Sequence, residues 1–386
     1  YFHFLAPAPA PTHHPVWRFL LTYKSVSVWL PFLWRFMRGF LHLLISFAIL
    51  PAPLLYHEGP LLKFYPKSML ESLRESFVFR ELFRPRLVHA GGVSIQILCP
   101  DGAMIDGMYF KSPEAKPNGP TVIRFNGNAE AFEFQDETLP RMYNGNGINL
   151  ILFNYRGVGR SRWVASFRSE LFGHLSGLCR TPVIRGTAMD AWAVVEYAVN
   201  GLGVPPAQLV LLGHSIGGAI AAHLAASHSN LPLPLCSSRS FASLVRVAME
   251  LAPGFFGLSA GSPKAKMLRR VAWAGLYLSG WEYDSVGNWY KVSGFKWIEY
   301  ASSDHIIPYD LSLHAVVQAD QEKPSRKRGN RNRERTLRVI QLIDAANTDN
   351  HNRLLFETEM IQHLEMVTEA IGRENGHVRP EVMLHA

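Results

Sequence analysis

A serine with glycines two positions before and after it lies between an apolar run and an alanine-rich segment. The chain reads QLVLLGHSIGGAIAAHLAA here, so the pattern is Gly213-His214-Ser215-Ile216-Gly217. In a G-x-S-x-G turn between a strand and a helix, the glycines let two backbones approach and the serine is held in a strained conformation. The pattern predicts a nucleophile at Ser215, supported by the turn residues Gly213, His214 and Gly217. The alternative is a glycine-rich turn without chemical function.

A nucleophilic serine needs a base, and the base needs a carboxylate that orients it. On a strand–turn–helix scaffold of this kind, the acid and then the histidine are expected after later strands. Asp304 follows the apolar run FKWIEY, and His351 lies in the polar segment after RVIQLI. We therefore predict that His351 takes the proton of Ser215 and that Asp304 holds His351. The alternative for Asp304 is an ordinary turn or capping residue.

Other acids and histidines fit this order less well. Two acids lie in or beside regular structure, one precedes the strand, and one is too close in sequence to His351. The remaining histidines considered fall within helical patterns. The residues set aside on these grounds are Asp310, Asp344, Asp284, Asp349, His314 and His363.

The charged oxygen of a tetrahedral intermediate needs two backbone N–H donors. Ile216, the residue after the nucleophile, is expected to supply one. The segment Asn126-Gly127-Asn128-Ala129 follows the apolar run TVIRF, and we predict that Asn128 supplies the second in a loop shaped by Asn126 and Gly127. The alternative is a simple turn, which Asn and Gly favour.

These residues require a scaffold in which several strands end at one edge. The sequence predicts an α/β fold, because apolar runs of strand length alternate with helical patterns. We expect a mostly parallel, doubly wound sheet with helices on both faces, opened by an antiparallel pair within residues 86–110. The predicted strands are 121–126, 149–154, 208–213, 295–300 and 338–343, and the clearest helices are 187–199, 216–228 and 354–371.

An apolar region, residues 1–84, precedes the predicted catalytic domain at 85–386. Residues 39–56 contain no Asp, Glu, Lys or Arg, and as a helix they would span about 27 Å, close to the thickness of a bilayer's hydrocarbon core. Pro51 and Pro53 shorten the uninterrupted run to the length of an interfacial or buried helix. We expect membrane attachment, single-pass or monotopic; the alternative is an apolar hairpin packed on the domain.

The net charge of +8 is concentrated in two segments. Residues 1–57 hold four basic and no acidic residues, and residues 321–335 hold seven basic and two acidic residues. The rest of the chain has a net charge of −1, so no basic surface for nucleic acid is predicted. The three cysteines lie far apart, without a second cysteine or a histidine at metal-ligand spacing, and no metal site is predicted.

The segments FNGNAE, NYRGVGRS, GHSIGG and SSDHIIP, together with the His351 loop, resemble the α/β-hydrolase superfamily over about residues 85–372. They are most similar to its single-span, membrane-anchored serine hydrolases, which are sometimes grouped with the prolyl-oligopeptidase-like (S9-type) peptidases. That family usually has His-Gly-Asn at the oxyanion loop, where this chain has Asn126. The resemblance implies hydrolysis of ester, thioester or amide bonds without a metal or organic cofactor.

Three further segments flank the predicted site: the insertions 161–182 and 253–294 and a basic loop at 321–335. The tryptophans and tyrosines of the second insertion could line an acyl pocket, face lipid or cover the sheet edge, and the basic loop is either solvated or attracted to anionic lipid. The leading hypothesis is a membrane-associated serine hydrolase acting through an acyl-enzyme on an acylated small molecule, lipid or acyl-protein. The alternatives are a serine peptidase acting on short peptides and a catalytically silent, membrane-tethered binding module.

Overall fold

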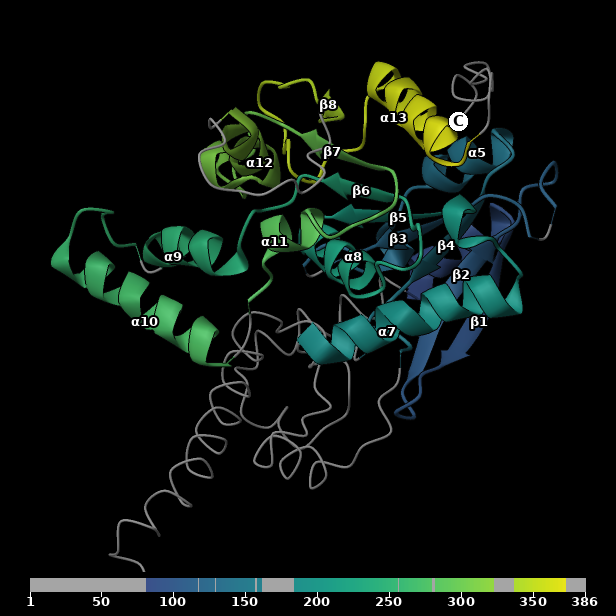
Figure 1. The fold of residues 1–386 in the computed structure, drawn as a ribbon, viewed down its shortest axis with the longest axis horizontal. Coiled ribbons are helices and arrows are strands. Elements are labelled where there is room, and N and C mark those ends of the chain that lie inside the picture. The colour runs from purple at the N-terminus through teal and green to yellow at the C-terminus, as the bar shows by residue number, and fades with distance from the viewer. Residues whose placement is uncertain are drawn as a thin grey trace, which may run out of the picture.

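The structure is a computed structural model, and the part it describes carries the whole predicted catalytic core (Figure 1). The predictions for the N-terminal apolar region, nearly all of the first insertion and most of the basic loop lie outside the described residues. No helix within the described part is long and apolar enough to cross a membrane. The described residues are 81–116, 118–128, 130–156, 158–161, 184–255, 257–279, 282–322 and 337–372.

Eight strands form one sheet in the order β1-β2-β4-β3-β5-β6-β7-β8. β1 pairs antiparallel with β2, and β2 pairs antiparallel with β4, whereas all other neighbours are parallel. The strands are β1 (Gly92–Leu98), β2 (Met104–Phe110), β3 (Thr121–Phe125), β4 (Asn149–Phe153), β5 (Leu209–His214), β6 (Leu235–Ser238), β7 (Lys296–Tyr300) and β8 (Val339–Gln341).

The chain reverses its winding direction at β3. β4 lies on one side of β3 and β5 lies on the other, so the loops after β3 and β5 diverge at the carboxyl edge of the sheet. In open parallel sheets, ligands bind at such a switch point. The register aligns Phe125 of β3 with Gly213 of β5, and Gly213 with Ser237 of β6. The predicted oxyanion loop and the predicted nucleophile therefore begin side by side.

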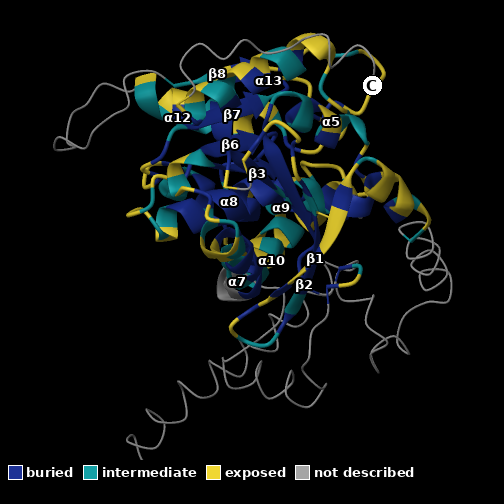
Figure 2. Cartoon of the chain, turned by 90° about the vertical axis from the view of Figure 1, so that its right-hand side faces the viewer, coloured by how far each residue is buried: buried dark blue, intermediate teal, exposed yellow. Residues whose placement is uncertain are grey.

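Helices cover both faces of the sheet, as Figures 1 and 2 show. The central strands are buried on both faces, which explains their unbroken apolar sequences (dark blue in Figure 2). Ile123, Ile151 and Leu211 pack with α7, α8, α11 and α12, whereas Leu150 and Leu212 face α5 and α13. The helices are α5 (Thr138–Gly145), α7 (Ile184–Glu196), α8 (Ile216–Ser227), α9 (Leu244–Phe255), α10 (Pro263–Ser279), α11 (Ser285–Trp289), α12 (Leu313–Glu322) and α13 (Glu357–Ala370).

The sheet confirms the predicted fold class, and three local expectations need correction. Residues 81–89 are helical, so the antiparallel opening begins only at Gly92. β6 was not predicted, because its sequence LCSS is short and half polar. β8 is limited to three residues, Val339–Gln341, because it is an edge strand whose first and last residues are exposed.

Candidate active site

Ser215 occupies a tight turn between β5 and α8. Its backbone has φ 53° and ψ −121°, a conformation that non-glycine residues rarely adopt and that stores strain. A Cβ on Gly213 would lie 2.4 Å from the carbonyl oxygen of Gly217, and a Cβ on Gly217 would lie 2.2 Å from the carbonyl oxygen of Phe125. Both glycines are therefore required by backbone contacts, and the predicted turn has the geometry of a nucleophile elbow.

Asp304 and His351 form a buried pair at the same edge. Nδ1 of His351 lies 2.7 Å from Oδ2 of Asp304, and both side chains are about 4% exposed. Oδ1 of Asp304 accepts hydrogen bonds from the backbone N–H groups of Ile306 (2.9 Å) and Ile307 (2.8 Å). Because the ionised carboxylate only accepts, the proton on this histidine sits on Nδ1 and leaves Nε2 as an acceptor.

Ser215 lies at the same sheet edge as this pair but is not joined to it by a hydrogen bond. Among the described residues, the serine hydroxyl makes no hydrogen bond with His351. The ring of His214, the preceding residue, lies 4.9 Å from the ring of His351, measured between centroids. In structures without substrate, catalytic hydrogen bonds are often long and form only in the reacting complex. The fold thus brings the three predicted residues to one edge and joins two of them directly.

A partly buried carboxylate, that of Glu130, fixes the loop after β3. Oε2 of Glu130 accepts a 2.5 Å hydrogen bond from the backbone N–H of Gly127, and its Oε1 lies 2.6 Å from the Arg124 guanidinium. A Cβ on Gly127 would lie 3.5 Å from the Cβ of Ser215, so the loop runs directly beside the serine. The N–H of Gly127 is therefore engaged, whereas that of Asn128 has no acceptor within the described part of the chain.

The charge of Glu130 is maintained despite its surroundings. Burial by itself would raise the pKa of Glu130, but the guanidinium of Arg124 and the hydrogen bond from the N–H of Gly127 outweigh it and hold the pKa at about 2. The carboxylate is consequently ionised and can only accept hydrogen bonds. Sequence reasoning did not find Glu130; the available signal was an acid three residues after Gly127 in NGNAE.

The side chain of Asn126 bonds to the end of the neighbouring strand β4. Its Nδ2 donates to the carbonyl oxygen of Phe153 (2.9 Å) and to Oδ1 of Asn154 (3.4 Å), at the end of β4. Asn154 in turn accepts from the N–H of Phe132 and donates to Glu133. Asn126 therefore fastens the start of the oxyanion loop to β4 and does not reach the reacting centre.

His214 is buried and neutral. Burial first, and then the nearby Arg239, lower the pKa of His214 well below its usual value. Its Nε2 contacts Oδ1 of Asn352 at 3.4 Å, and a Cβ on Gly127 would lie 3.0 Å from its Cδ2. The ring thus lies between the loop after β3 and the His351 ring.

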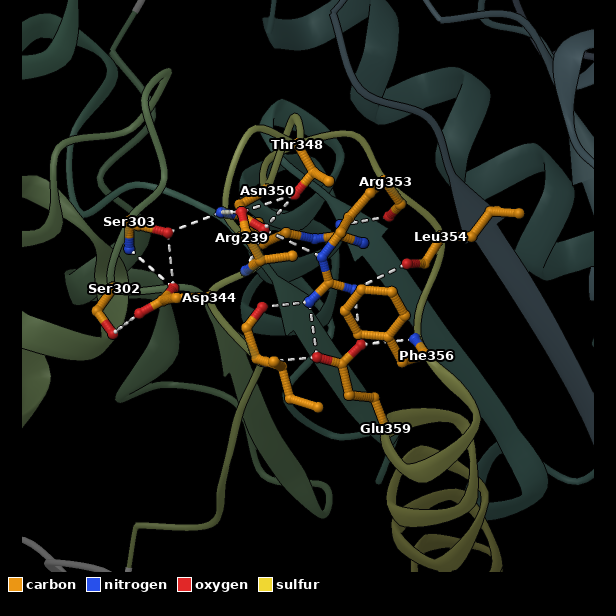
Figure 3. Close-up of polar contacts among 12 residues, drawn as sticks. Arg239, Ser302, Ser303, Asp344, Thr348, Asn350, Arg353, Leu354, Phe356 and Glu359 are labelled. Carbon is orange, nitrogen blue, oxygen red and sulfur yellow. Dashed lines mark hydrogen bonds and ion pairs between the residues drawn. The ribbon is translucent and has the colours of Figure 1, made fainter.

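The loops that carry Asp304 and His351 are fastened to one another (Figure 3). Nδ2 of Asn350 donates to Oγ of Ser303 at 2.8 Å, and this bond joins the immediate neighbours of the acid and the base. Ser303 also donates through its N–H and hydroxyl to Oδ1 of Asp344. These contacts could not be predicted from the sequence, because the partners are 41 and 47 residues apart.

Two arginines hold the far side of the His351 loop (Figure 3). Arg353 forms an ion pair with Glu359 at 2.7 Å and donates to the carbonyl oxygen of Ile343. Arg239 is buried directly after β6 and donates to the carbonyl oxygen of Arg353 at 2.7 Å. Arg239 adopts a φ of 48°, an uncommon conformation that this contact helps to maintain. The base loop is therefore tied to β6 and to α13.

The acids set aside from the sequence have structural roles. Asp284 accepts the N–H of Gly287 and caps α11. Asp349 accepts the N–H groups of His351 and Asn352, so it shapes the turn and does not meet the imidazole of His351. Asp344 bonds Ser302 and Ser303, and Asp310 lies in a short 3-10 turn. His314 stacks on Tyr300, with ring centroids 3.6 Å apart.

A second buried cluster lies under α13. One ligand atom each from Cys236, Glu299 and His363 falls within 4.8 Å of the others, a spacing that a metal ion could occupy. Both ring nitrogens of His363 are already engaged, Nδ1 by Glu299 at 2.5 Å and Nε2 by the hydroxyl of Tyr143 at 2.6 Å. Burial alone would raise the pKa of Glu299, but His363 holds it at about 2. Hydrogen bonding accounts for this cluster without a metal.

Comparison with known proteins agrees with this architecture. A family model described as the alpha/beta hydrolase fold matches residues 120–245, from β3 through the serine turn. Over these residues the chain is similar to the α/β-hydrolase fold. An esterase of Pyrococcus furiosus superposes with a TM-score of 0.50 at 13% identity, over 73% of this chain and 91% of that chain. An alpha-beta hydrolase of Vibrio vulnificus superposes with a TM-score of 0.50 at 16% identity, over 75% and 86%.

Two curated relatives are similar to this chain over less than half of its length. An uncharacterised protein of Mycobacterium tuberculosis is 30% identical over 40% of this chain and 48% of its own length. The alpha/beta hydrolase domain-containing protein WAV2 of Arabidopsis thaliana is 26% identical over 44% of this chain and 50% of its own length. The matches span about half the length of these relatives.

Proposed function

We propose that the chain is a serine hydrolase that cleaves acyl ester or thioester bonds through Ser215, His351 and Asp304. The observation that carries the proposal is the buried 2.7 Å contact between His351 Nδ1 and Asp304 Oδ2 at the sheet edge where Ser215 is held in a strained turn. That combination supplies an oriented base at the same sheet edge as the nucleophile, which acyl transfer requires.

In the proposed reaction, Oγ of Ser215 attacks the acyl carbon while Nε2 of His351 takes the hydroxyl proton. Asp304 stabilises the resulting imidazolium, and the backbone N–H groups of Ile216 and Asn128 stabilise the charged oxygen. Collapse of the intermediate breaks the bond to the leaving oxygen or sulfur, which takes the proton from His351. Water then attacks the acyl-enzyme, gives its proton to His351, and Ser215 is released with the proton returned.

Labelling with a fluorophosphonate probe tests the nucleophile directly. Full-length protein is compared with Ser215→Ala and His351→Ala, and thermal unfolding of each variant shows that it is folded. We expect labelling of wild type, none of Ser215→Ala, and labelling of His351→Ala slowed by at least about a thousandfold, because an unassisted serine is a poor nucleophile. Folded wild type that stays unlabelled would favour the catalytically silent binding module.

Substrate class is then tested with matched acyl donors. Hydrolysis of p-nitrophenyl esters and of the corresponding thioesters, with acyl chains of graded length, is compared with cleavage of short peptide p-nitroanilides. Esters or thioesters turned over faster than the anilides would support the proposal. Preferential cleavage of the anilides would instead indicate the prolyl-oligopeptidase-like peptidase.

A further inference from the structure

Two helices extend from the carboxyl edge of the sheet as a hairpin. α9 begins six residues after the end of β6, and α10 leads back to α11. An isolated β-bridge pairs Ser243, just before α9, with Asp284, just before α11, so the two ends of the hairpin lie side by side. Figure 1 shows α9 and α10 side by side, reaching away from the sheet. The hairpin therefore carries a surface of its own, attached at the edge that also holds Ser215.

One face of α10 packs inward and the opposite face is exposed. Ala265 and Leu276 are buried, and Leu268 and Ala272 are partly buried, at the spacing of one helical stripe. On the other side, Met267 is 68% exposed. Two rows of exposed residues run along the other side of the helix. One row is Lys264, Met267 and Val271, spaced i, i+3 and i+7, and the other is Lys266, Arg270 and Trp273.

The helix α10 is also rich in basic residues. α10 contains four basic residues and no acid, and residues 244–279 as a whole contain five basic residues and one acid. That acid, Glu250 on α9, is already paired with Arg269 at 3.0 Å. Outside this hairpin and the two basic segments 1–57 and 321–335, the chain has a net charge of −5. The exposed face of α10 is thus a basic and apolar patch beside an otherwise acidic body.

We propose that this face, defined by Lys264, Lys266, Met267, Arg270 and Val271, docks on the surface of an anionic lipid bilayer. A helix with apolar side chains between lysines and arginines is suited to the headgroup region, where the apolar groups insert and the long basic chains reach the lipid phosphates. The apolar positions stand on a convex helix, so they offer no groove for a protein segment. The proposal does not depend on the catalytic assignment, because it concerns binding alone.

A fluorescent probe on α10 tests the proposal in the full-length chain. Met267→Cys, in a Cys179→Ser background, is labelled with nitrobenzoxadiazole; Cys99 and Cys236 are buried and remain unlabelled. The control places the probe at Val93, which is 63% exposed on β1 at the opposite end of the sheet. Vesicles of phosphatidylcholine with about a third phosphatidylserine should shift the emission of the probe at 267 to the blue, and should leave the probe at 93 unchanged. Pure phosphatidylcholine should shift neither.

Removing the charges gives the second measurement. The triple variant Lys264→Gln, Lys266→Gln, Arg270→Gln should bind anionic vesicles about a hundredfold more weakly. Each basic residue near an anionic surface contributes about a fivefold factor to the binding constant. Thermal unfolding verifies that the triple variant is folded. No blue shift at 267 with anionic vesicles, an equal shift with neutral vesicles, or no effect of the triple substitution would overturn the proposal. So would a shift produced without lipid by raising the protein concentration or adding polyglutamate, since these indicate a second copy or an acidic protein.

Discussion

Replacing Asp304 with asparagine should abolish most activity while leaving the fold intact. Oδ1 of Asp304 accepts two backbone N–H groups, from Ile306 and Ile307, so in Asp304→Asn the amide oxygen must stay there. The amide NH₂ is then forced to face Nδ1 of His351, at the 2.7 Å position now held by Oδ2. Because NH₂ can only donate, Nδ1 must become the acceptor and the proton moves to Nε2.

The expected loss of activity follows from this change in the tautomer of His351. With Nε2 protonated, His351 cannot take the proton of Ser215, and the expected fall in kcat is about 10⁴-fold, or about 5 kcal/mol of transition-state stabilisation. The fold should be nearly unaffected, since the two N–H groups keep their acceptor and the side chain keeps its shape. We expect the melting temperature of Asp304→Asn to change by a few degrees at most.

The assay is hydrolysis of p-nitrophenyl acetate together with the rate of fluorophosphonate labelling, measured on wild type and Asp304→Asn. Asp349→Asn is the matched control, because Asp349 lies beside His351 in sequence but contacts the backbone N–H groups of His351 and Asn352, the side chain of Asn352 and the ring of His305, not the imidazole of His351. Its activity should stay within about tenfold of wild type. If Asp304→Asn kept activity within tenfold while Asp349→Asn lost it, the assignment of the orienting acid would be wrong.

Three more perturbations test the supporting structure. Glu130→Ala should lower kcat for p-nitrophenyl acetate about tenfold to a hundredfold by freeing the loop beside Ser215, and an unchanged kcat would contradict that role. Gly217→Ala should abolish labelling and stable folding because its Cβ meets a backbone oxygen at 2.2 Å, whereas Gly254→Ala, with no atom within 4 Å, should be harmless in thermal unfolding. Glu299, with a folded pKa of about 2 against an ordinary 4.5, contributes stability above pH 4.5 that is lost as the pH falls toward 2. The difference in melting temperature between wild type and Glu299→Gln should therefore shrink between pH 5 and pH 3, and a constant difference would refute this linkage.

Most strands of the sheet could be predicted because burial on both faces favours apolar residues within the strand itself. Strands buried on both faces are mostly apolar, and β3, β4, β5 and β7 can each be recognised by a mostly apolar sequence. β6 is harder to recognise, because it is only four residues long and half of it, Ser237 and Ser238, is polar and buried. Its carbonyl oxygen at Ser238 accepts the N–H of Ser215 at 2.9 Å, so β6 is specified by its neighbours rather than by its own sequence.

In the candidate site, too, some residues could be predicted from the sequence and others could not. Ser215, Asp304 and His351 could be placed from the sequence because each follows a recognisable strand. Glu130, Arg239 and Asn350 could not, because their partners are loop backbones or residues brought together only by the complete sheet. A carboxylate that accepts one loop N–H leaves no periodic pattern. Such contacts are the ones that fix the position of a base to within the tolerance that catalysis requires.

The site and the proposed lipid surface are supported by separate parts of the molecule. Each loop at the carboxyl edge has its own tether: Glu130 for the oxyanion loop, Asn350 for the junction of the acid and base loops, and Arg239 for the end of the base loop. None of these tethers involves α10, which within the described part of the chain packs mainly on α9. Residues without shared contacts contribute independently. Substitutions on the exposed face of α10 should therefore change where the enzyme acts, and substitutions in the tethers should change how fast it acts.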